Sequence, residues 1–485
     1  MKRSFKSILI GLASIGLLTL LVLTLTSCGG TTKLKIYAVS GRVVTDNDMP
    51  LSGATVLLYR YKVTNVELIN LKAEYPNHGV DTAMLDDFDH RTSKPVYSVS
   101  TDGDGTFAFP KVENGLYRMV FYKEGYGFKY QNNFLVDTNL SNIQAMLLPV
   151  LELPPGIASD MSLDDERMYL ISRETIVLPG VSISVGRNVT ILVHPDLRFI
   201  VHGNLSIDAG TSLRLMSSDA LYSHTNDNVV EFESVDFVGQ NNQVIRNLKV
   251  TDCLLGLRIS NSNDVLVTNV YLNSPYQGMA VTATSGFSIK NSCFTGSQDM
   301  VRAALGIEHS SNVLLEKNVF RGNAMGARIG FSPNVVVRNN YFADNSVFDF
   351  GFDQDAQGLV EYNTFRSSNI AIDNYRGQMV AKYNDIEAKI GIYAYRVNAT
   401  LTANHNNLNC SQYGIKSQCM YYNSDVVYLD CKRNYWNTTS LETIMGLIYD
   451  RNNESESDEN YHLLKTIIEF QPISTKPNQA GAYND

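Results

Sequence analysis

The sequence is short of the features that mark nucleic-acid-binding and metal-binding proteins. Its formal net charge is −9, and no long basic run follows the N-terminal segment. Because DNA and RNA are bound through surfaces rich in lysine and arginine, no nucleic-acid partner is expected. The eight histidines are scattered rather than spaced as pairs of metal ligands. We therefore predict no site for a transition metal.

Cysteine is also scarce, with six residues in a chain of 485. The spacing of the five that follow Cys28 matches no zinc-binding pattern. Cys410, Cys419 and Cys431 fall within 22 residues, and export of the protein would permit a disulfide among them. The sequence does not say which pair would form, and the odd total leaves at least one thiol free.

The first residues have the layout of a secretory signal. A short basic segment is followed by an apolar run over residues 8–25. The run ends in Leu25-Thr26-Ser27-Cys28-Gly29, which resembles the bacterial lipobox. This resemblance implies that residues 1–27 are removed as a lipoprotein signal peptide and that Cys28 becomes a lipidated N-terminus. An uncleaved membrane anchor is the alternative.

Lipidation would attach the protein to a bilayer. Acyl chains supply about 0.8 kcal/mol per buried methylene, so a multiply acylated Cys28 would hold the protein on a membrane stably. Residues 28–33 begin with Cys-Gly-Gly-Thr-Thr and are expected to form a flexible tether. The resemblance implies a location on the bacterial outer membrane, at the cell surface or on the periplasmic face.

Residues 34–148 alternate between short strands and turns, and no helix is expected there. Three segments stand out: Ser40-Gly41-Arg42-Val43-Val44, Pro50-Leu51-Ser52-Gly53-Ala54 and Thr101-Asp102-Gly103-Asp104-Gly105. Together they resemble the carboxypeptidase regulatory-like domain. The resemblance implies a small β-sandwich that acts as a spacer or adhesion module without chemistry of its own. Residues 63–98 are longer than a hairpin needs and are rich in aspartate, so we expect an inserted loop.

Calcium is the one cofactor that the sequence allows. Asp102 and Asp104 alternate with glycines, and carboxylate oxygens at alternate positions suit a hard cation. The remaining ligands of a calcium loop are missing, so a plain turn is the favoured interpretation. Beyond the sandwich, residues 149–157 contain Pro154-Pro155-Gly156 and are expected to form a linker.

A repeat dominates the rest of the chain. Apolar residues that close one strand of each unit recur every 21 to 26 residues: Val250, Leu272, Phe294, Phe320, Phe342, Phe365, Ile386 and Leu408. Short strands at this period, without the helix of a βα unit, indicate the coils of a parallel β-helix. Glycine-closed strands between residues 175 and 215 resemble the opening coils of pectate-lyase-like β-helices. We predict an all-β chain with a right-handed parallel β-helix over residues 158–473 and a flexible tail over 474–485.

An asparagine stands two residues before the closing position in five successive units: Asn318, Asn340, Asn363, Asn384 and Asn406. Equivalent residues of stacked coils lie about 4.8 Å apart, so their amides can bond to one another. We therefore predict a structural asparagine ladder rather than a set of turn residues. Glycines such as Gly256 and Gly326 should turn the chain into the next strand, and the single Trp436 should cap the core.

The strand after each glycine turn should point alternate residues outward and so form one long face. Charged and tyrosine side chains concentrate on this face. The resemblance to glycan-processing β-helices implies that a sugar-binding groove lies there. The candidate catalytic residues are Asp349, Asp353 and Asp373 as acids, with Arg328 as a base or as a clamp for a uronate. The candidate substrate-binding residues are Glu308, Tyr393, Tyr395, Arg376 and Arg396.

Two functions remain open from the sequence. The first is a monomeric lipoprotein whose β-helix binds an extracellular polysaccharide, either neutral or acidic. In this interpretation the protein could also process the polysaccharide as a lyase or glycoside hydrolase. The paired-aspartate and Gly-His-Gly motifs of polygalacturonases and the arginine signature of pectate lyases are not found. The second is a non-catalytic structural or adhesive solenoid, in which Glu308, Arg328 and Asp349 pair along the stack. A one-residue slip would exchange the inward and outward positions.

Overall fold

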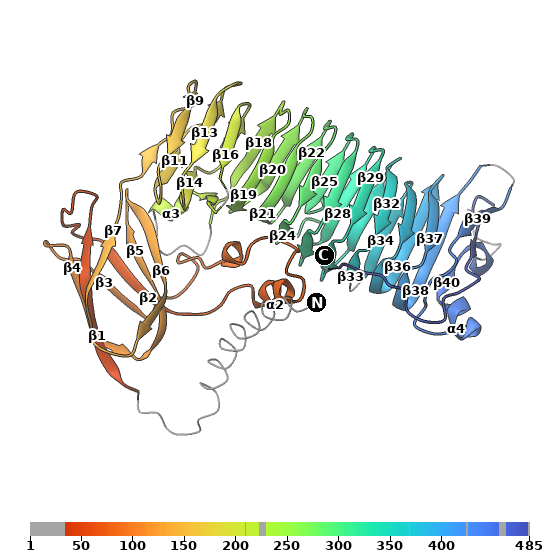
Figure 1. Ribbon diagram of the computed structural model, residues 1–485, viewed down its shortest axis with the longest axis horizontal. Coiled ribbons are helices and arrows are strands. Elements are labelled where there is room, and N and C mark those ends of the chain that lie inside the picture. Colours follow the sequence, from red (N-terminus) through yellow and green to blue (C-terminus); the bar gives the residue numbers. More distant parts are fainter. Residues whose placement is uncertain are drawn as a thin grey trace, which may run out of the picture.

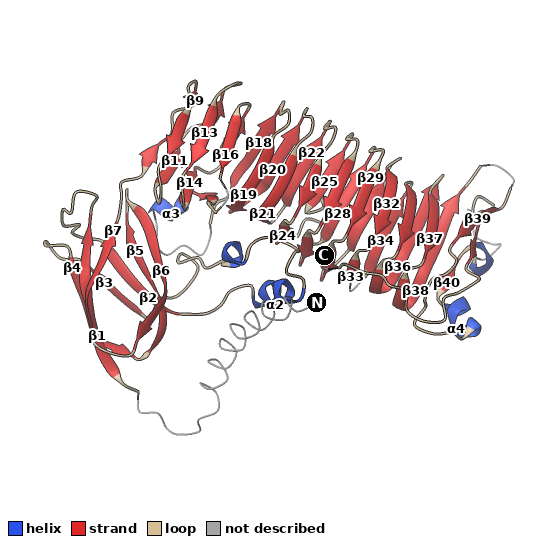
Figure 2. Ribbon diagram, in the orientation of Figure 1, coloured by secondary structure: helices blue, strands red, loops and turns tan. Residues whose placement is uncertain are grey.

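The computed structural model describes residues 34–208, 210–222, 229–367, 369–422, 425–454 and 462–483 (Figure 1). The predicted signal peptide, Cys28 and the predicted tether lie outside these ranges. Strands dominate the described chain (Figure 2). No helix within the described ranges is long and apolar enough to cross a bilayer.

The N-terminal module consists of two sheets, with the strand orders β4-β1-β7 and β3-β2-β5-β6. Its strands are β1 (Ile36–Val44), β2 (Thr55–Arg60), β3 (Tyr97–Ser100), β4 (Thr106–Glu113), β5 (Gly115–Lys123), β6 (Gly127–Val136) and β7 (Leu140–Met146). Alternate side chains of both sheets, such as Val43, Val56 and Phe107, share one apolar core. The alternation of apolar and polar residues in the sequence thus produces a two-layered β module.

The turn before β4 uses its first carboxylate to hold the backbone. Asp102 Oδ1 accepts hydrogen bonds from the backbone N–H groups of Asp104, at 3.0 Å, and Thr106, at 2.9 Å. The Thr106 hydroxyl donates to Asp102 Oδ2 at 2.6 Å. Asp102 therefore acts as a turn acceptor, in agreement with the plain-turn interpretation.

The segment between β2 and β3 contains α2 (Val66–Glu74) and the 3₁₀ helix η1 (Thr82–Leu85). The prediction that this region has no helix was therefore wrong. An isolated helix of nine residues is unstable in water, so α2 depends on its packing against the rest of the protein rather than on its local sequence. Leu68 and Leu71 of α2 are buried because they pack beside Val319 of the solenoid. Figure 1 shows α2 next to the middle of the solenoid.

The rest of the chain winds into a parallel β-helix with three faces, which we name A, B and C. Face A consists of β9 (Gly156–Ile157), β12 (Thr175–Val177), β15 (Arg198–Val201), β18 (Phe232–Val238), β20 (Cys253–Ser260), β22 (Gln277–Thr282), β25 (Leu305–Glu308), β28 (Met325–Gly330), β31 (Phe348–Asp353), β34 (Ile370–Tyr375), the C-terminal halves of β36 (Asp385–Val397) and β38 (Asn407–Met420), and β40 (Ile448–Tyr449).

Face B consists of β10 (Met161–Leu163), β13 (Ser182–Val185), β16 (Asn204–Ile207), the N-terminal halves of β19 (Val244–Thr251) and β21 (Leu266–Asn273), β23 (Ser288–Lys290), β26 (Val313–Glu316), β29 (Val335–Arg338), β32 (Gln357–Glu361), β35 (Gln378–Lys382) and β37 (Thr400–Asn404), with β39 (Val427–Asp430) and β41 (Thr466–Glu469) at its end.

Face C consists of β8 (Leu151–Glu152), β11 (Met168–Ile171), β14 (Val189–Val193), β17 (Leu213–Ser217), the C-terminal halves of β19 and β21, β24 (Cys293–Thr295), β27 (Val319–Arg321), β30 (Tyr341–Ala343), β33 (Thr364–Arg366) and the N-terminal halves of β36 and β38. Short helices α3 (Asp219–Tyr222), α4 (Leu441–Gly446) and η2 (Arg451–Asn453) lie in the connections.

The solenoid begins earlier in the chain than predicted. β8 pairs with β11 and β9 pairs with β12, although both lie within the predicted linker. Leu153 and Ile157 of this segment are buried in the solenoid core. The prediction of a linker over residues 149–157 was therefore wrong, and Pro154-Pro155-Gly156 forms a corner of the first coil.

The repeat predicted from the sequence is confirmed on face C. All eight closing residues, from Val250 to Leu408, are paired with one another in register. Their side chains point inward, and the rings of Phe294 and Phe320 stack with centroids 4.7 Å apart. Trp436 is 1% exposed and covers the last part of the same core, as predicted.

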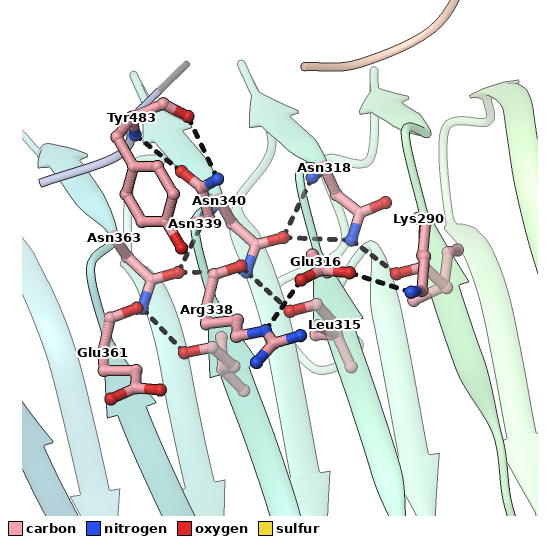
Figure 3. A network of polar contacts seen from close by, with 12 residues as sticks. Lys290, Leu315, Glu316, Asn318, Arg338, Asn339, Asn340, Glu361, Asn363 and Tyr483 are labelled. Carbon is pink, nitrogen blue, oxygen red and sulfur yellow. Dashed lines mark hydrogen bonds and ion pairs between the residues drawn. The ribbon is translucent and has the colours of Figure 1, made fainter. Parts of the chain in front are cut away.

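The asparagine ladder is also confirmed (Figure 3). Asn318 Nδ2 donates to Asn340 Oδ1 at 3.0 Å, and Asn340 Nδ2 donates to Asn363 Oδ1 at 3.0 Å. The same pattern continues through Asn384 and Asn406 to Asn434. All of these side chains are fully buried, so each amide replaces the hydrogen bonds that it would have made with water.

A second, shorter ladder was not predicted. Asn323 and Asn345 stand three residues after the closing positions, and Asn323 Nδ2 donates to Asn345 Oδ1 at 3.0 Å. The equivalent residue of the preceding coil is Ser297, whose backbone N–H donates to Asn323 Oδ1 at 3.1 Å. The repeated spacing from Phe320 and Phe342 would have been sufficient to find this pair.

Face C is covered by three segments of the same chain. Tyr122 and Phe128 of the N-terminal module pack on Leu192 and Met216 of the first coils. The next coils are covered by the inserted segment, residues 63–96, which we call the clasp. The C-terminal segment, residues 474–483, which we call the strap, lies over the following coils.

The clasp is attached by buried charged groups. Lys249 Nζ donates to the carbonyl oxygens of Met84, at 2.9 Å, and Asp86, at 2.7 Å, and lies 2.7 Å from Asp87 Oδ1. Lys249 is 7% exposed, and burial lowers the pKa of its amine. The Tyr271 hydroxyl donates to the same Asp87 carboxylate. The aspartates of the predicted loop therefore attach the clasp to the solenoid.

The strap contradicts the prediction of a flexible tail over residues 474–485, as far as residue 483. Tyr483 exchanges two backbone hydrogen bonds with the Asn339 side chain, at 2.7 and 3.1 Å (Figure 3). The backbone N–H of Asn478 donates to Asn407 Oδ1 at 2.8 Å. Asn339 also lies 3.1 Å from His78 Nε2, so the clasp and the strap meet at one amide. These contacts depend on distant coils, which local composition does not reveal.

Candidate functional site

Face A carries two outward rows that run along the solenoid. The first row comprises Asp236, Arg258, Ala280, Gly306, Arg328, Gly351, Asp373, Tyr393 and Lys416. The second row comprises Val238, Ser260, Thr282, Glu308, Gly330, Asp353, Tyr375, Tyr395 and Gln418. The intervening residues, such as Ile259 and Ile329, point into the core, as predicted.

Five of the predicted residues come together on neighbouring coils of this face. We call Arg328, Asp353, Asp373, Tyr393 and Tyr395 the tyrosine site. Arg328 forms an ion pair with Asp353. The Tyr395 hydroxyl donates to Asp373 Oδ2 at 3.3 Å. The rings of Tyr393 and Tyr395 are stacked, with centroids 4.3 Å apart and planes at 10°.

Further residues that the sequence analysis did not name complete the surroundings. Lys416 Nζ lies 4.7 Å from the ring centre of Tyr393 and 5.1 Å from that of Tyr449. The Tyr393 hydroxyl donates to Gln418 Oε1 at 2.6 Å, and Gln418 Nε2 donates to Glu454 at 2.8 Å. Lys416 and Gln418 each stand 23 residues after a tyrosine of the site, so extending the repeat by one coil would have found them.

The two carboxylates of the tyrosine site are largely enclosed. Asp353 is 9% exposed and Asp373 is 8% exposed. Burial raises the pKa of Asp373 to about 7, and the hydrogen bond from Tyr395 and the charge of Arg328 act in the opposite direction. At neutral pH Asp373 is therefore a mixture of the protonated and ionised forms. Burial also raises the pKa of Tyr393 to about 12.

Asp349 does not belong to this site, so the prediction that it points outward was wrong. It is fully buried, and its Oδ1 accepts a hydrogen bond from Asn345 Nδ2 at 2.8 Å. Asp349 is equivalent to Gly326 of the preceding coil, at the position where the chain turns into face A. The alternation of inward and outward side chains begins only after this position. Burial raises the pKa of its carboxyl to about 8.

The other predicted binding residues lie at the margins of the site. Glu308 is exposed in the second row, but Gly330 separates it from Asp353. Arg376 lies in the turn after β34 with a φ of 62°, so it is not part of the face. Arg396 is exposed, and its guanidinium lies 5.9 Å from the ring centre of Tyr375.

Two further expectations concern ion pairs and cysteines. Arg328 pairs with Asp353, so the row of pairs that was to join Glu308, Arg328 and Asp349 does not form. Cys253, Cys293, Cys410, Cys419 and Cys431 are all free, so the structure contains no disulfide among Cys410, Cys419 and Cys431. No cluster of three histidine, cysteine or acidic residues suited to a metal is present in the described ranges.

Comparison with known proteins supports the fold. Residues 277–426 match the family model described as right-handed beta helix region, a match shorter than half of the chain. No curated protein matches the sequence. Among solved structures, the chain is similar to PfbA, a surface adhesin of Streptococcus pneumoniae, with 12% identity and a TM-score of 0.30. That similarity covers 55% of this chain and 82% of PfbA. The family-model match and the sheet topology confirm the predicted all-β fold with a right-handed parallel β-helix.

Proposed function

We propose that the tyrosine site binds a polysaccharide and that the protein is held on the bacterial outer membrane by a lipid on Cys28. One observation carries the proposal for binding. Tyr393 and Tyr395 stack on each other on the outward side of face A, next to the cations Arg328 and Lys416. Such a surface offers both flat apolar rings and positive charges to a ligand.

The geometry suits a chain of sugars better than a compact ligand. Equivalent side chains repeat along the solenoid about every 4.8 Å, so similar contacts can be made in successive coils. Tyrosine rings pack against the apolar faces of sugar rings and their hydroxyls can bond to sugar hydroxyls. Arginine and lysine supply charge-assisted hydrogen bonds to carboxylates or sulfates. We therefore propose that the ligand is acidic.

The acids of the site support this surface rather than contact the ligand. Asp353 holds Arg328, and Asp373 accepts the hydroxyl of Tyr395. Asp353 and Asp373 are only 9% and 8% exposed, so a polysaccharide would meet the tyrosine and arginine side chains first. The geometry therefore supports binding best, with Asp353 and Asp373 as positioning residues.

Cleavage of the polysaccharide is a second candidate function, and one observation favours it. The pKa of Asp373 is raised to about 7, which is the range in which a carboxyl can donate a proton to a leaving group. Asp353 stands in the neighbouring coil as a second carboxylate. This function requires Tyr395 to move away from Asp373. Loss of turnover in Asp373→Asn, with binding retained, would establish it.

The binding proposal is tested by removing the tyrosine and arginine together. We expect the Arg328→Ala/Tyr395→Ala variant to bind polygalacturonate, alginate or heparin at least about tenfold more weakly than the wild type, which corresponds to about 1.4 kcal/mol. The matched control is Arg338→Ala/Tyr362→Ala, which removes an arginine of face B and a tyrosine of the adjacent turn. Unchanged binding across acidic and neutral glycans would leave the structural solenoid as the better account.

The membrane proposal has its own test. Cys28→Ala should release the processed protein into the soluble fraction, because the lipid would no longer be attached. Globomycin, which inhibits the lipoprotein signal peptidase, should cause the unprocessed form to accumulate. Membrane retention of the processed Cys28→Ala variant would refute lipid anchoring and leave the polysaccharide proposal unaffected.

A further inference from the structure

A cleft lies at the C-terminal end of face C, away from the tyrosine site. It has a volume of about 220 Å³ and is open to solvent, so a ligand would lie in it partly exposed. Its floor is formed by the outward side chains of β33, β36 and β38, and Pro477 of the strap forms part of its wall. The backbone of the strap is held there by Asn407, which exchanges two hydrogen bonds with Asn478, at 2.8 and 3.2 Å.

Polar side chains line the cleft in two rows. The first row contains Asp385, Asn407 and Tyr435, and the second contains Arg366, Glu387 and Asn409. Neighbours within each row belong to adjacent coils and are about 4.8 Å apart. Asn437 extends the second row, because its Nδ2 donates to Asn409 Oδ1 at 3.0 Å. Amides, carboxylates and one tyrosine ring therefore face a single space.

The charges in the cleft favour a ligand without acidic groups. Arg366 Nη2 lies 2.6 Å from Asp385, and Arg366 Nε lies 4.0 Å from Glu387, so its positive charge is shared by two carboxylates. The side chain of Glu387 is 63% exposed, which leaves this carboxylate accessible to a ligand. A uronate or sulfated sugar would meet uncompensated negative charge, whereas hydroxyl, amide and amino groups could bond to the carboxylates and amides.

We infer that this cleft is a second carbohydrate site, which binds a saccharide with hydroxyl, amide or amino groups and no acidic group. The inference does not rest on the proposed function of face A. The two sites are connected by structure, because β36 and β38 each run from the cleft on face C to the tyrosine site on face A.

The test measures binding of uncharged and amino-bearing hexasaccharides to the whole protein by calorimetry. The probes are cellohexaose, mannohexaose, N-acetylated chitohexaose and chitosan hexamer, with hexagalacturonate as the acidic probe. We expect at least one non-acidic probe to bind. Asn409→Ala should weaken that binding about tenfold or more, and Glu387→Gln should weaken binding of the chitosan hexamer most.

Two controls separate this cleft from other surfaces. Glu233→Gln removes another glutamate that is 42% exposed and lies 3.7 Å from an arginine, and it should leave binding unchanged. Tyr395→Ala, which alters face A, should also leave non-acidic binding unchanged. The inference is overturned if no non-acidic probe binds the wild type, if Asn409→Ala binds as well as the wild type, or if Tyr395→Ala weakens the same binding equally.

Discussion

Faces A and C are built from the same coils but differ in what lies on them. The outward residues of face C include Leu192, Met216 and Val319, which are buried under the N-terminal module and the clasp. The outward residues of face A include Arg328 and Tyr395, which contact other side chains of the same face and remain partly exposed. A solenoid exposes all its faces unless other segments cover them.

The difference separates stability from recognition. Face C buries apolar and charged groups against three segments of the chain, so its side chains contribute to folding. Face A keeps a stacked tyrosine pair and two partly exposed cations, Arg328 and Lys416, that no other segment of the described chain covers. Residues of face C should therefore affect melting when they are changed, whereas residues of face A should affect binding.

The largest effect is expected at the clasp on face C. Lys249→Ala removes the buried partner of Asp87 and leaves that carboxylate without its cation. Loss of one partner of a buried pair costs about 3–5 kcal/mol, so we expect this loss in the free energy of unfolding. The measurement is denaturant-induced unfolding followed by circular dichroism.

An exposed ion pair provides the control for Lys249. Arg187 lies 2.7 Å from Asp165, the same separation as in the Lys249–Asp87 pair, but the two side chains are 72% and 47% exposed. Arg187→Ala should therefore lower the free energy of unfolding far less than Lys249→Ala does. Equal losses in the two variants would mean that the clasp does not stabilise face C.

The asparagine ladder should give the next largest effect, because it lies inside the coils that both faces share. Asn363→Ala removes the acceptor of Asn340 and is expected to cost about 1–3 kcal/mol. Asn263, whose amide bonds to Asn241 at 3.1 Å on the exposed surface, is the control, and Asn263→Ala should change stability by about 0.5 kcal/mol or less. An unchanged melting temperature for Asn363→Ala would contradict a stabilising ladder.

The sequence predicted the interior of the solenoid better than its coverings. The positions from Val250 to Leu408 could be aligned because each residue interacts with its equivalent one coil away, at a regular spacing. The clasp and the strap escaped prediction because Lys249 and Asn339 meet segments that are far away in the sequence. For the tyrosine site, alternation placed Arg328, Asp373 and Tyr393 outward, but it failed at Asp349, next to the turn.

Asp349 should make the stability of the interior depend on pH. Its pKa is about 8 in the folded protein and 3.8 in the absence of burial, so the folded state retains a proton that the unfolded state has lost between these values. The protonated Asp349 carboxyl therefore contributes to the free energy of unfolding. This contribution is fully present below pH 3.8 and is lost as the pH rises through about 8.

Asp349→Asn removes the ionisation and keeps the acceptor for Asn345. The variant should melt at a higher temperature than the wild type at pH 8.5, and the difference should shrink steadily toward pH 4. A constant difference between Asp349→Asn and the wild type over that range would mean that the pKa of Asp349 is not raised in the folded protein.

The smallest effect on stability is expected on face A, at Lys416. Its amine lies over the ring of Tyr393, and a cation in such a position contributes about 0.5–1 kcal/mol. Lys416→Ala should therefore change the free energy of unfolding by about 1 kcal/mol or less, yet weaken binding of an acidic polysaccharide about tenfold, since the charge faces the ligand. Unfolding and binding are measured on the same preparation, with Lys382→Ala on face B as the control. A large loss of stability with unchanged binding would mean that face A, like face C, serves folding. Weaker binding with nearly unchanged stability would show that the same coils serve two purposes. Their face C is then needed for folding, and their face A binds a ligand.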